Sequence, residues 1–150
     1  MEFEIRKVSA QAPVLQKMAD KDKWAYKEKW TCHVRTKRDG TLKVTIDPGY
    51  WTDLASVPKA LRGAFDNGSG EYGVLIASQV HDMFYSTHYM SKDFADSLFY
   101  ALLRHYGMSW AKAKAYYLVV AWFGDKAWEA ISDDQLVEDR KLCTFKWLDR

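Results

Sequence analysis

Hydrophobic and polar residues alternate along two stretches in the first third of the chain. Every second residue over residues 26–34 shares one face, and residues 42–46 repeat the alternation. Asp39-Gly40 between them is a strong turn signal, because both residue types accept the backbone of a tight hairpin turn. We therefore expect a β-hairpin, preceded by a short strand at residues 3–7. The residues expected on the shared faces are Tyr26, Glu28, Trp30, Cys32 and Val34, then Leu42, Val44 and Ile46.

The hydrophobic spacing changes to a helical period in the second half of the chain. Helices are predicted over residues 73–85, 92–106 and 109–123, and a weaker helical segment follows from Asp125. Strands that precede helices in this way are typical of an α+β fold. We expect an N-terminal β-hairpin or small antiparallel sheet packed on a C-terminal bundle of about three helices, in a single domain over residues 1–150.

Serine and glycine residues mark the ends of these helices. Ser91 precedes the second helix and Gly107 follows it, as expected of an N-cap and a helix stop. Ser109 and Gly124 bracket the third helix in the same way. A further short helix, with a proline in its first turn, is expected to be capped by Ser56.

Composition narrows the class of protein without identifying a function. The formal net charge of +2 over 150 residues gives no reason to expect a nucleic-acid partner. The 7 Trp, 9 Tyr and 7 Phe residues indicate either a core built of large rings, which is the preferred interpretation, or an aromatic surface that binds a partner. Residues 115–123 form the most apolar stretch, but a transmembrane helix needs about 20 residues. We expect this stretch to be a buried helix of a soluble protein.

The cysteines and the beginning of the chain bear on cellular location. Cys32 and Cys143 fit no metal-binding or redox spacing, so they are expected to be free thiols in a reducing compartment. The first twenty residues contain no long apolar run. We therefore expect no conventional secretion signal.

One group of polar residues has the spacing of a catalytic site. His81 and Asp82 are adjacent, so their side chains on a helix point about 100° apart and face different partners. Tyr85 lies one turn beyond both. Since helices joined by a short loop are usually antiparallel neighbours, Asp96 on the next helix is expected within hydrogen-bond reach of His81 or Tyr85. Its carboxylate would orient the imidazole, whose other nitrogen would act as a base.

Structural interpretations of the same residues stay open. His81, Tyr85 and Asp96 also suit a hydrogen-bond network that ties two helices together, with Asp82 exposed. Asp53 follows a strand and either adds a carboxylate to a cation site or caps a turn. No role is assigned to the histidine expected on the outer side of the sheet, His33, or to three residues expected to face solvent: His88, Asp93 and His105.

Several motifs occur together between the hairpin and the end of the third helix. They are Gly49-Tyr50-Trp51-Thr52-Asp53-Leu54-Ala55-Ser56-Val57-Pro58, His81-Asp82 with Tyr85, Ala95-Asp96 with Phe99, and Trp122-Phe123-Gly124. Through them, residues 42–128 resemble the family named domain of unknown function 1353, which is carried mainly by tailed bacteriophages and prophages. Lys92 stands where that family often has arginine. The resemblance implies a phage protein in the host cytoplasm or the virion, with virion or host proteins as partners, and implies no biochemical activity.

The His-Asp-x-x-Tyr spacing is also similar to that of secreted phospholipase A2 enzymes. In those enzymes the histidine activates water, the adjacent aspartate binds calcium, and the tyrosine and a distant aspartate hold the histidine. The similarity implies that His81 is the base and that Asp82 binds a divalent cation such as Ca²⁺. It assigns the orienting role to Tyr85 and Asp96.

Three hypotheses about function follow. The first is a metal-assisted hydrolase of an ester or related acyl bond, in which Asp53 and carbonyl oxygens of residues 49–56 complete the cation site. The alternative is a non-catalytic virion or assembly component, or a factor that binds a host protein through its tryptophans and apolar third helix. A phosphohydrolase of the His-Asp type is disfavoured, because the earlier histidine that it needs, His33, lies in an expected strand.

Overall fold

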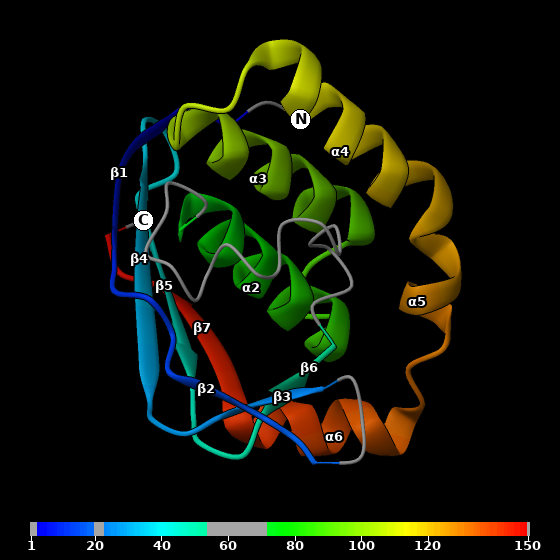
Figure 1. The fold of residues 1–150 in the computed structure, drawn as a ribbon. Coiled ribbons are helices and arrows are strands. Elements are labelled where there is room, and N and C mark those ends of the chain that lie inside the picture. The colour runs from blue at the N-terminus through cyan, green and yellow to red at the C-terminus, as the bar shows by residue number, and fades with distance from the viewer. Residues whose placement is uncertain (1–2, 20–22, 54–71, 150) are drawn as a thin grey trace.

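An antiparallel sheet of four strands forms one side of the protein, and the helices lie against one of its faces (Figure 1). The structure is a computed structural model that describes residues 3–19, 23–53 and 72–149. The strands of this sheet, in spatial order, are β1 (Ile5–Ala10), β4 (Trp30–Thr36), β5 (Thr41–Ile46) and β7 (Cys143–Trp147).

The predicted hairpin is confirmed as β4 and β5. Cys32 pairs with Val44 in the antiparallel register, and Gly40 turns the chain with φ of +90°. The inward-facing residues of both strands are buried. The expectation for Glu28 is wrong, because it is exposed in the connection that separates β4 from a shorter strand, β3 (Trp24–Tyr26).

A second, smaller sheet joins β3 to two other short strands. Its order is β2 (Leu15–Lys17), β3 and β6 (Trp51–Thr52), all antiparallel. Trp24 pairs with Thr52, so this sheet fixes the position of β6. Strand β2 lies in a region from which the sequence pattern predicted no strand.

Five helices follow β6 in the described part of the chain. The three predicted helices are present, and Ser91 and Ser109 cap two of them through bonds from the backbone N–H groups of Phe94 and Lys112. The weaker segment after residue 124 forms two helices. The short helix expected at Ser56 lies outside the described residues. The helices are α2 (Tyr72–Thr87), α3 (Lys92–His105), α4 (Trp110–Phe123), α5 (Asp125–Glu129) and α6 (Asp133–Leu142).

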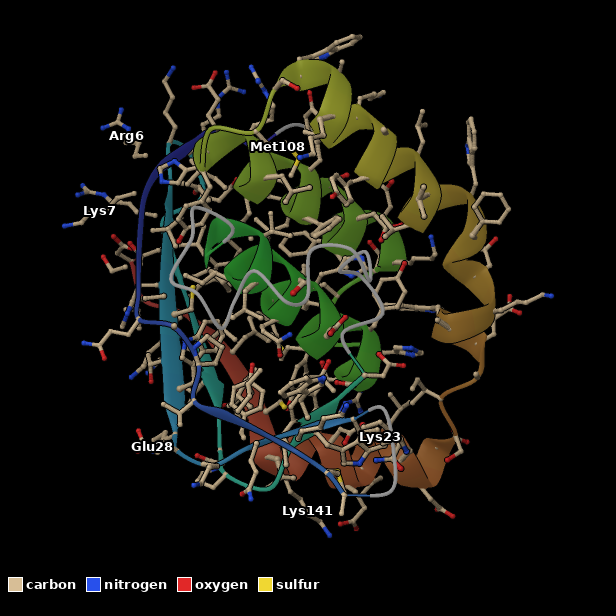
Figure 2. All side chains as sticks on the ribbon, viewed as in Figure 1. Arg6, Lys7, Lys23, Glu28, Met108 and Lys141 are labelled. Carbon is tan, nitrogen blue, oxygen red and sulfur yellow. The ribbon has the colours of Figure 1, made fainter. Side chains whose placement is uncertain are left out.

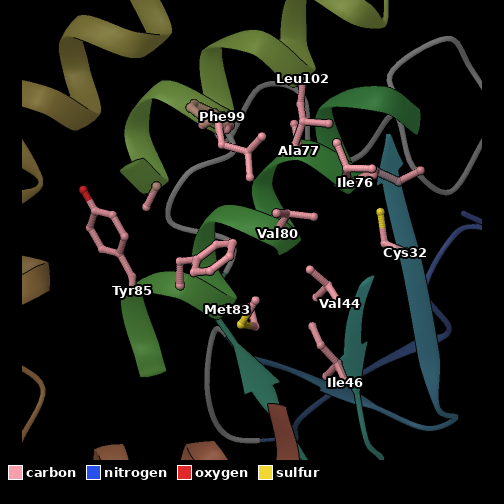
Figure 3. Packing of buried hydrophobic residues seen from close by; sticks show 14 of the residues in the cluster. Cys32, Val44, Ile46, Ile76, Ala77, Val80, Met83, Tyr85, Phe99 and Leu102 are labelled. Carbon is pink, nitrogen blue, oxygen red and sulfur yellow. The ribbon is translucent and has the colours of Figure 1, made fainter. Parts of the chain in front are cut away.

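Helix α2 is the central element, and it is buried along almost its whole length. Val80 of α2 points toward Val44 of β5, while Phe99 of α3 approaches α2 from the other side (Figure 3). The prediction that the apolar third helix is the buried one is wrong. Helix α4 carries lysines and packs only one side on α3, whereas α2 carries neither lysine nor arginine and fills the centre.

The chain ends in a strand that the sequence pattern did not predict. The sequence pattern indicated only a weak helical segment after Asp125, but residues 143–147 form β7, which pairs with β5. The alternation of Cys143, Phe145 and Trp147 with Thr144 and Lys146 is the strand pattern that was overlooked. The α+β class is confirmed, with the correction that the last strand follows the helices.

The two cysteines are free, as expected, and both are buried. Burial raises the pKa of the Cys32 thiol to about 12, so this side chain stays a neutral thiol. No helix in the described part of the chain has both the length and the apolar character needed to cross a bilayer.

Candidate functional site

His81 of α2 and Asp96 of α3 form a buried pair. His81 Nε2 lies 2.7 Å from Asp96 Oδ1, and each residue is 2% exposed. Tyr85, one turn after His81, donates its hydroxyl to the same carboxylate oxygen at 2.8 Å. The structure therefore brings together the three residues predicted from the His-Asp-x-x-Tyr spacing, because α2 and α3 are antiparallel neighbours joined by residues 88–91.

The second oxygen of Asp96 is held by Lys92. Lys92 Nζ lies 2.7 Å from Asp96 Oδ2, one turn away on the same helix. The same ammonium donates to the backbone carbonyls of Val120 and Ala121 at 3.1 and 3.3 Å, and lies 3.5 Å from Asp125 Oδ1. Lys92 thus connects the buried carboxylate to the C-terminal end of α4, where helix carbonyls attract a cation. Sequence reasoning missed this role, although the i,i+4 spacing was visible.

His81, Tyr85 and Lys92, all bound to the Asp96 carboxylate, form a network whose charge state follows from these bonds. Burial by itself raises the pKa of the Asp96 carboxyl, but the hydrogen bonds from its three partners outweigh that effect and leave the pKa below its ordinary value. Burial and the hydrogen bond to Asp96 raise the pKa of Tyr85. Asp96 is therefore a carboxylate that accepts from a permanently protonated phenol.

Aromatic rings hold the imidazole from two sides. The His81 ring centroid lies 4.2 Å from that of Tyr85 and 4.8 Å from that of Phe99. Tyr85 in turn packs edge-on against Trp128 of α5, with 5.1 Å between centroids. These contacts fix the plane of the imidazole as well as its hydrogen-bonded edge.

Gly124 allows the link between α4 and α5 to approach the network closely. A Cβ atom added to Gly124 would lie 2.5 Å from Tyr85 Oη and closer still to the Val120 carbonyl oxygen. Both distances are shorter than real Cβ contacts, so only glycine fits without a shift of its neighbours.

Asp82 lies beside the histidine and is tied to the small sheet. Its Oδ2 accepts a hydrogen bond from Thr52 Oγ1 at 2.6 Å, and its Oδ1 lies 4.0 Å from His81 Nδ1. The Asp82 side chain is 15% exposed. Thr52 was not among the predicted site residues, and no spacing rule relates it to α2.

Asp53 follows Thr52 and is exposed at the rim of the same pocket as Asp82. The rest of the expected cation loop, residues 54–56, lies outside the described residues. Within the described ranges, no group of three or more His, Cys, Asp or Glu residues has the arrangement of a metal site.

A pocket of about 500 Å³ opens over His81, Asp82 and Tyr85. Residues 50–53 form one wall, and the end of α4, α5 and the beginning of α6 form the opposite one. That opposite wall is mainly apolar, and its apolar residues are Val119, Val120, Phe123, Ala127, Ala130 and Ile131. The polar pair His81–Asp82 is therefore at one side of a largely apolar pocket.

His88 was expected to face solvent, but it is half-buried. Its ring stacks on Trp128 at 3.7 Å between centroids, with 10° between the planes. Its Nε2 is buried and makes no hydrogen bond within the described residues, and its φ is +52°. Burial lowers the pKa of this imidazole. Asp93 and His105 are exposed, as expected.

The comparisons with known proteins relate the chain to one family. The model of the family described as "Protein of unknown function (DUF1353)" matches residues 24–120, which is more than half of the chain. The chain belongs to this family. The match includes His81, Asp82, Tyr85 and Asp96, and it confirms the resemblance inferred from the motifs. Comparisons with curated proteins and with solved structures gave no significant match.

Proposed function

We propose that this member of the DUF1353 family is a hydrolase of an ester or related acyl bond. The observation that carries the proposal is the orientation of His81, whose Nε2 is held 2.7 Å from the buried carboxylate of Asp96 while its ring lines the pocket. A carboxylate that fixes one imidazole nitrogen sets the tautomer and stabilises the imidazolium that forms in catalysis. Tyr85 supports this role, because its hydroxyl holds the same carboxylate oxygen.

The proposed reaction uses water as the nucleophile. His81 takes a proton from water through Nδ1, and the hydroxide attacks the acyl carbon. The bond from that carbon to the leaving oxygen then breaks, and the imidazolium returns the proton to the leaving group. Asp96 and Tyr85 keep the imidazole in place during both transfers.

A divalent cation fits part of this site. Asp82 and Asp53 present hard carboxylate oxygens at the same pocket, which are the ligands that Ca²⁺ prefers. When bound, the ion would offset the negative charge that develops on the acyl oxygen. Carbonyl oxygens of residues 49–53, the described part of the expected cation loop, are the proposed source of further ligands.

The test is hydrolysis of nitrophenyl esters of increasing acyl length, measured with and without Ca²⁺. His81→Gln should lower the rate by about 100-fold or more, because an amide takes no proton near neutral pH. His33→Gln is the matched control, since His33 lies on the opposite face of the sheet from α2. Hydrolysis by a folded His81→Gln variant at the wild-type rate would contradict the proposal.

A second candidate is a non-catalytic phage protein, either a virion or assembly component or a factor that binds a host protein. The observation that favours it is Lys92, whose bonds to Asp96 and to the end of α4 make the network a tie between three helices. Phage complementation with His81→Gln separates the candidates. Full infectivity, with the protein at fixed copy number in purified virions, would favour the structural role.

In both candidates the cellular context is the one that the family resemblance suggested. We propose a phage-encoded protein that acts in the host cytoplasm or in the virion. Proteomic detection in infected cells and in purified particles would distinguish these locations.

A further inference from the structure

Helix α4 exposes large apolar side chains on the outside of the protein. Val119, Trp122 and Phe123 are 57%, 68% and 75% exposed. Of the residues of this helix, only Ala113 is buried. Apolar residues scattered singly need no explanation, but three within five residues form a patch that indicates a contact surface.

These residues share one side of the helix with a lysine. Steps of three or four residues lead from Lys112 to Ala115 and Val119, and from Val119 to Trp122 and Phe123, so these side chains lie on one side of the helix. All five are exposed, and we call them the α4 outer stripe. Ring-bearing side chains project from α4 away from the other helices (Figure 2).

The stripe carries one charged residue, Lys112, and the charged residues of α4 are all cationic, whereas exposed acids begin directly after the helix at Asp125 and Glu129. Residues 97–124 contain no aspartate or glutamate, whereas Arg104, Lys112 and Lys114 are all cationic. The first acid after them, Asp125, lies 3.5 Å from Lys92 Nζ. An apolar stripe that carries one lysine and no acid complements a layer of anionic headgroups above acyl chains, where lysine contacts phosphate and aromatic rings occupy the interface.

The stripe is continuous with the pocket. Val119 and Phe123 belong to the stripe and also line the pocket that contains His81. A flat protein interface gives no reason for this continuity, whereas a bilayer surface does, because an acyl chain could enter the apolar pocket without crossing water.

We propose that the α4 outer stripe docks on the surface of an anionic lipid membrane. Trp122 and Phe123 insert among the headgroups, and Lys112 contacts lipid phosphates. The choice of a bilayer rests in part on the proposed acyl-binding pocket, but none of the stripe residues is assigned to the chemistry, so docking can be measured without hydrolysis.

The test is co-sedimentation of the full chain with vesicles of phosphatidylcholine, with and without phosphatidylglycerol. His81→Gln protein is used throughout, so that lipid cleavage does not affect the result. We expect binding to the anionic vesicles, and a loss of about tenfold or more for Trp122→Ser/Phe123→Ser. Val137→Ser on α6 is the apolar control, because Val137 is 54% exposed and lies outside the stripe.

The cationic part of the proposal has its own pair of variants. Lys112→Gln should weaken binding to anionic vesicles about fivefold, whereas Lys146→Gln on the outer face of the sheet should not. Circular dichroism establishes that each variant is folded. Equal binding by the His81→Gln protein with and without Trp122→Ser/Phe123→Ser, or no vesicle binding by the His81→Gln protein itself, would overturn the proposal. A dimer that this variant abolishes, without vesicle binding, would assign the stripe to a second copy of the chain.

Discussion

Lys92 Nζ lies 2.7 Å from Asp96 Oδ2, on the carboxylate oxygen that neither His81 nor Tyr85 uses. The Lys92 side chain is 18% exposed and that of Asp96 is 3% exposed, so a charge at the edge of the fold neutralises one inside it. The same ammonium also binds the end of α4. Lys92 therefore holds both the pocket wall and the carboxylate that orients His81.

Lys92→Met should therefore destabilise the fold by about 2 to 4 kcal/mol, because it leaves a buried carboxylate without its cation. Lys92→Arg keeps the positive charge and should therefore lose much less stability. Urea unfolding of the two variants and the wild type measures the difference. A midpoint for Lys92→Met equal to that of the wild type would mean that the ion pair contributes nothing to stability.

Tyr85→Phe removes one hydrogen bond to Asp96 while keeping the ring. We expect a loss of stability of about 1 kcal/mol and a lower rate of ester hydrolysis, since the carboxylate that holds His81 is less constrained. Tyr26→Phe is the control, because Tyr26 makes a buried hydrogen bond to Gln79 away from the pocket. A similar fall in the rate of ester hydrolysis for both variants would mean that the fall comes from a general loss of stability and not from the bond between Tyr85 and Asp96.

Gly124→Ala should destabilise the protein by about 1 to 3 kcal/mol, because the new methyl group overlaps Tyr85 Oη and the Val120 carbonyl. Part of this cost should disappear in a Tyr85→Phe background, where the hydroxyl is absent. Thermal unfolding of the two single variants and the double variant measures this coupling. Strict additivity would place the alanine methyl away from Tyr85.

Calorimetric titration with Ca²⁺ and Mg²⁺ tests the proposed cation. Asp82→Asn should abolish binding and Asp53→Asn should weaken it, because each removes an anionic oxygen. Asp93→Asn, at an exposed position in the first turn of α3, serves as the control. Absence of heat with both ions in the wild type would leave the hydrolase proposal without its cation.

The free energy of unfolding is expected to decrease in weak acid because of His88. Burial lowers its pKa in the folded protein below the ordinary value of 6.5, so the unfolded chain takes up the proton more readily. The free energy of unfolding should therefore decrease as the pH falls through that ordinary value. His88→Asn, whose side chain accepts a positive φ, should flatten the profile between about pH 7 and pH 5. Urea unfolding across that range is the measurement, and an equal slope for both proteins would contradict the assignment.

Residues that are close in sequence or on consecutive helices were predictable. The hairpin followed from alternation around Asp39-Gly40, and the pairing of His81 with Asp96 followed from their places on two helices joined by a short loop. Local patterns specify such contacts, because the loop restricts how the two elements pack.

Contacts between distant segments could not be predicted in the same way. The hydrogen bond from Thr52 to Asp82 joins a two-residue strand to a helix, and no periodicity relates the two. The exposed position of α4 was missed, because the apolar run of residues 115–123 suits both a protein interior and an uncovered surface. Which helix became central was decided by the lysines of α4 and by the absence of such residues from α2.

The pairing of β7 with β5 has a consequence for how the chain folds during synthesis. One edge of β5 pairs with β4, which is nearby in sequence and leaves the ribosome with it, but the other edge pairs with residues 143–147. About one hundred residues must be translated between the two events, so β5 remains an unprotected edge while the helices form. A nascent chain arrested before residue 143 should therefore be the species most prone to misassociation, and release of the last strand should complete the fold.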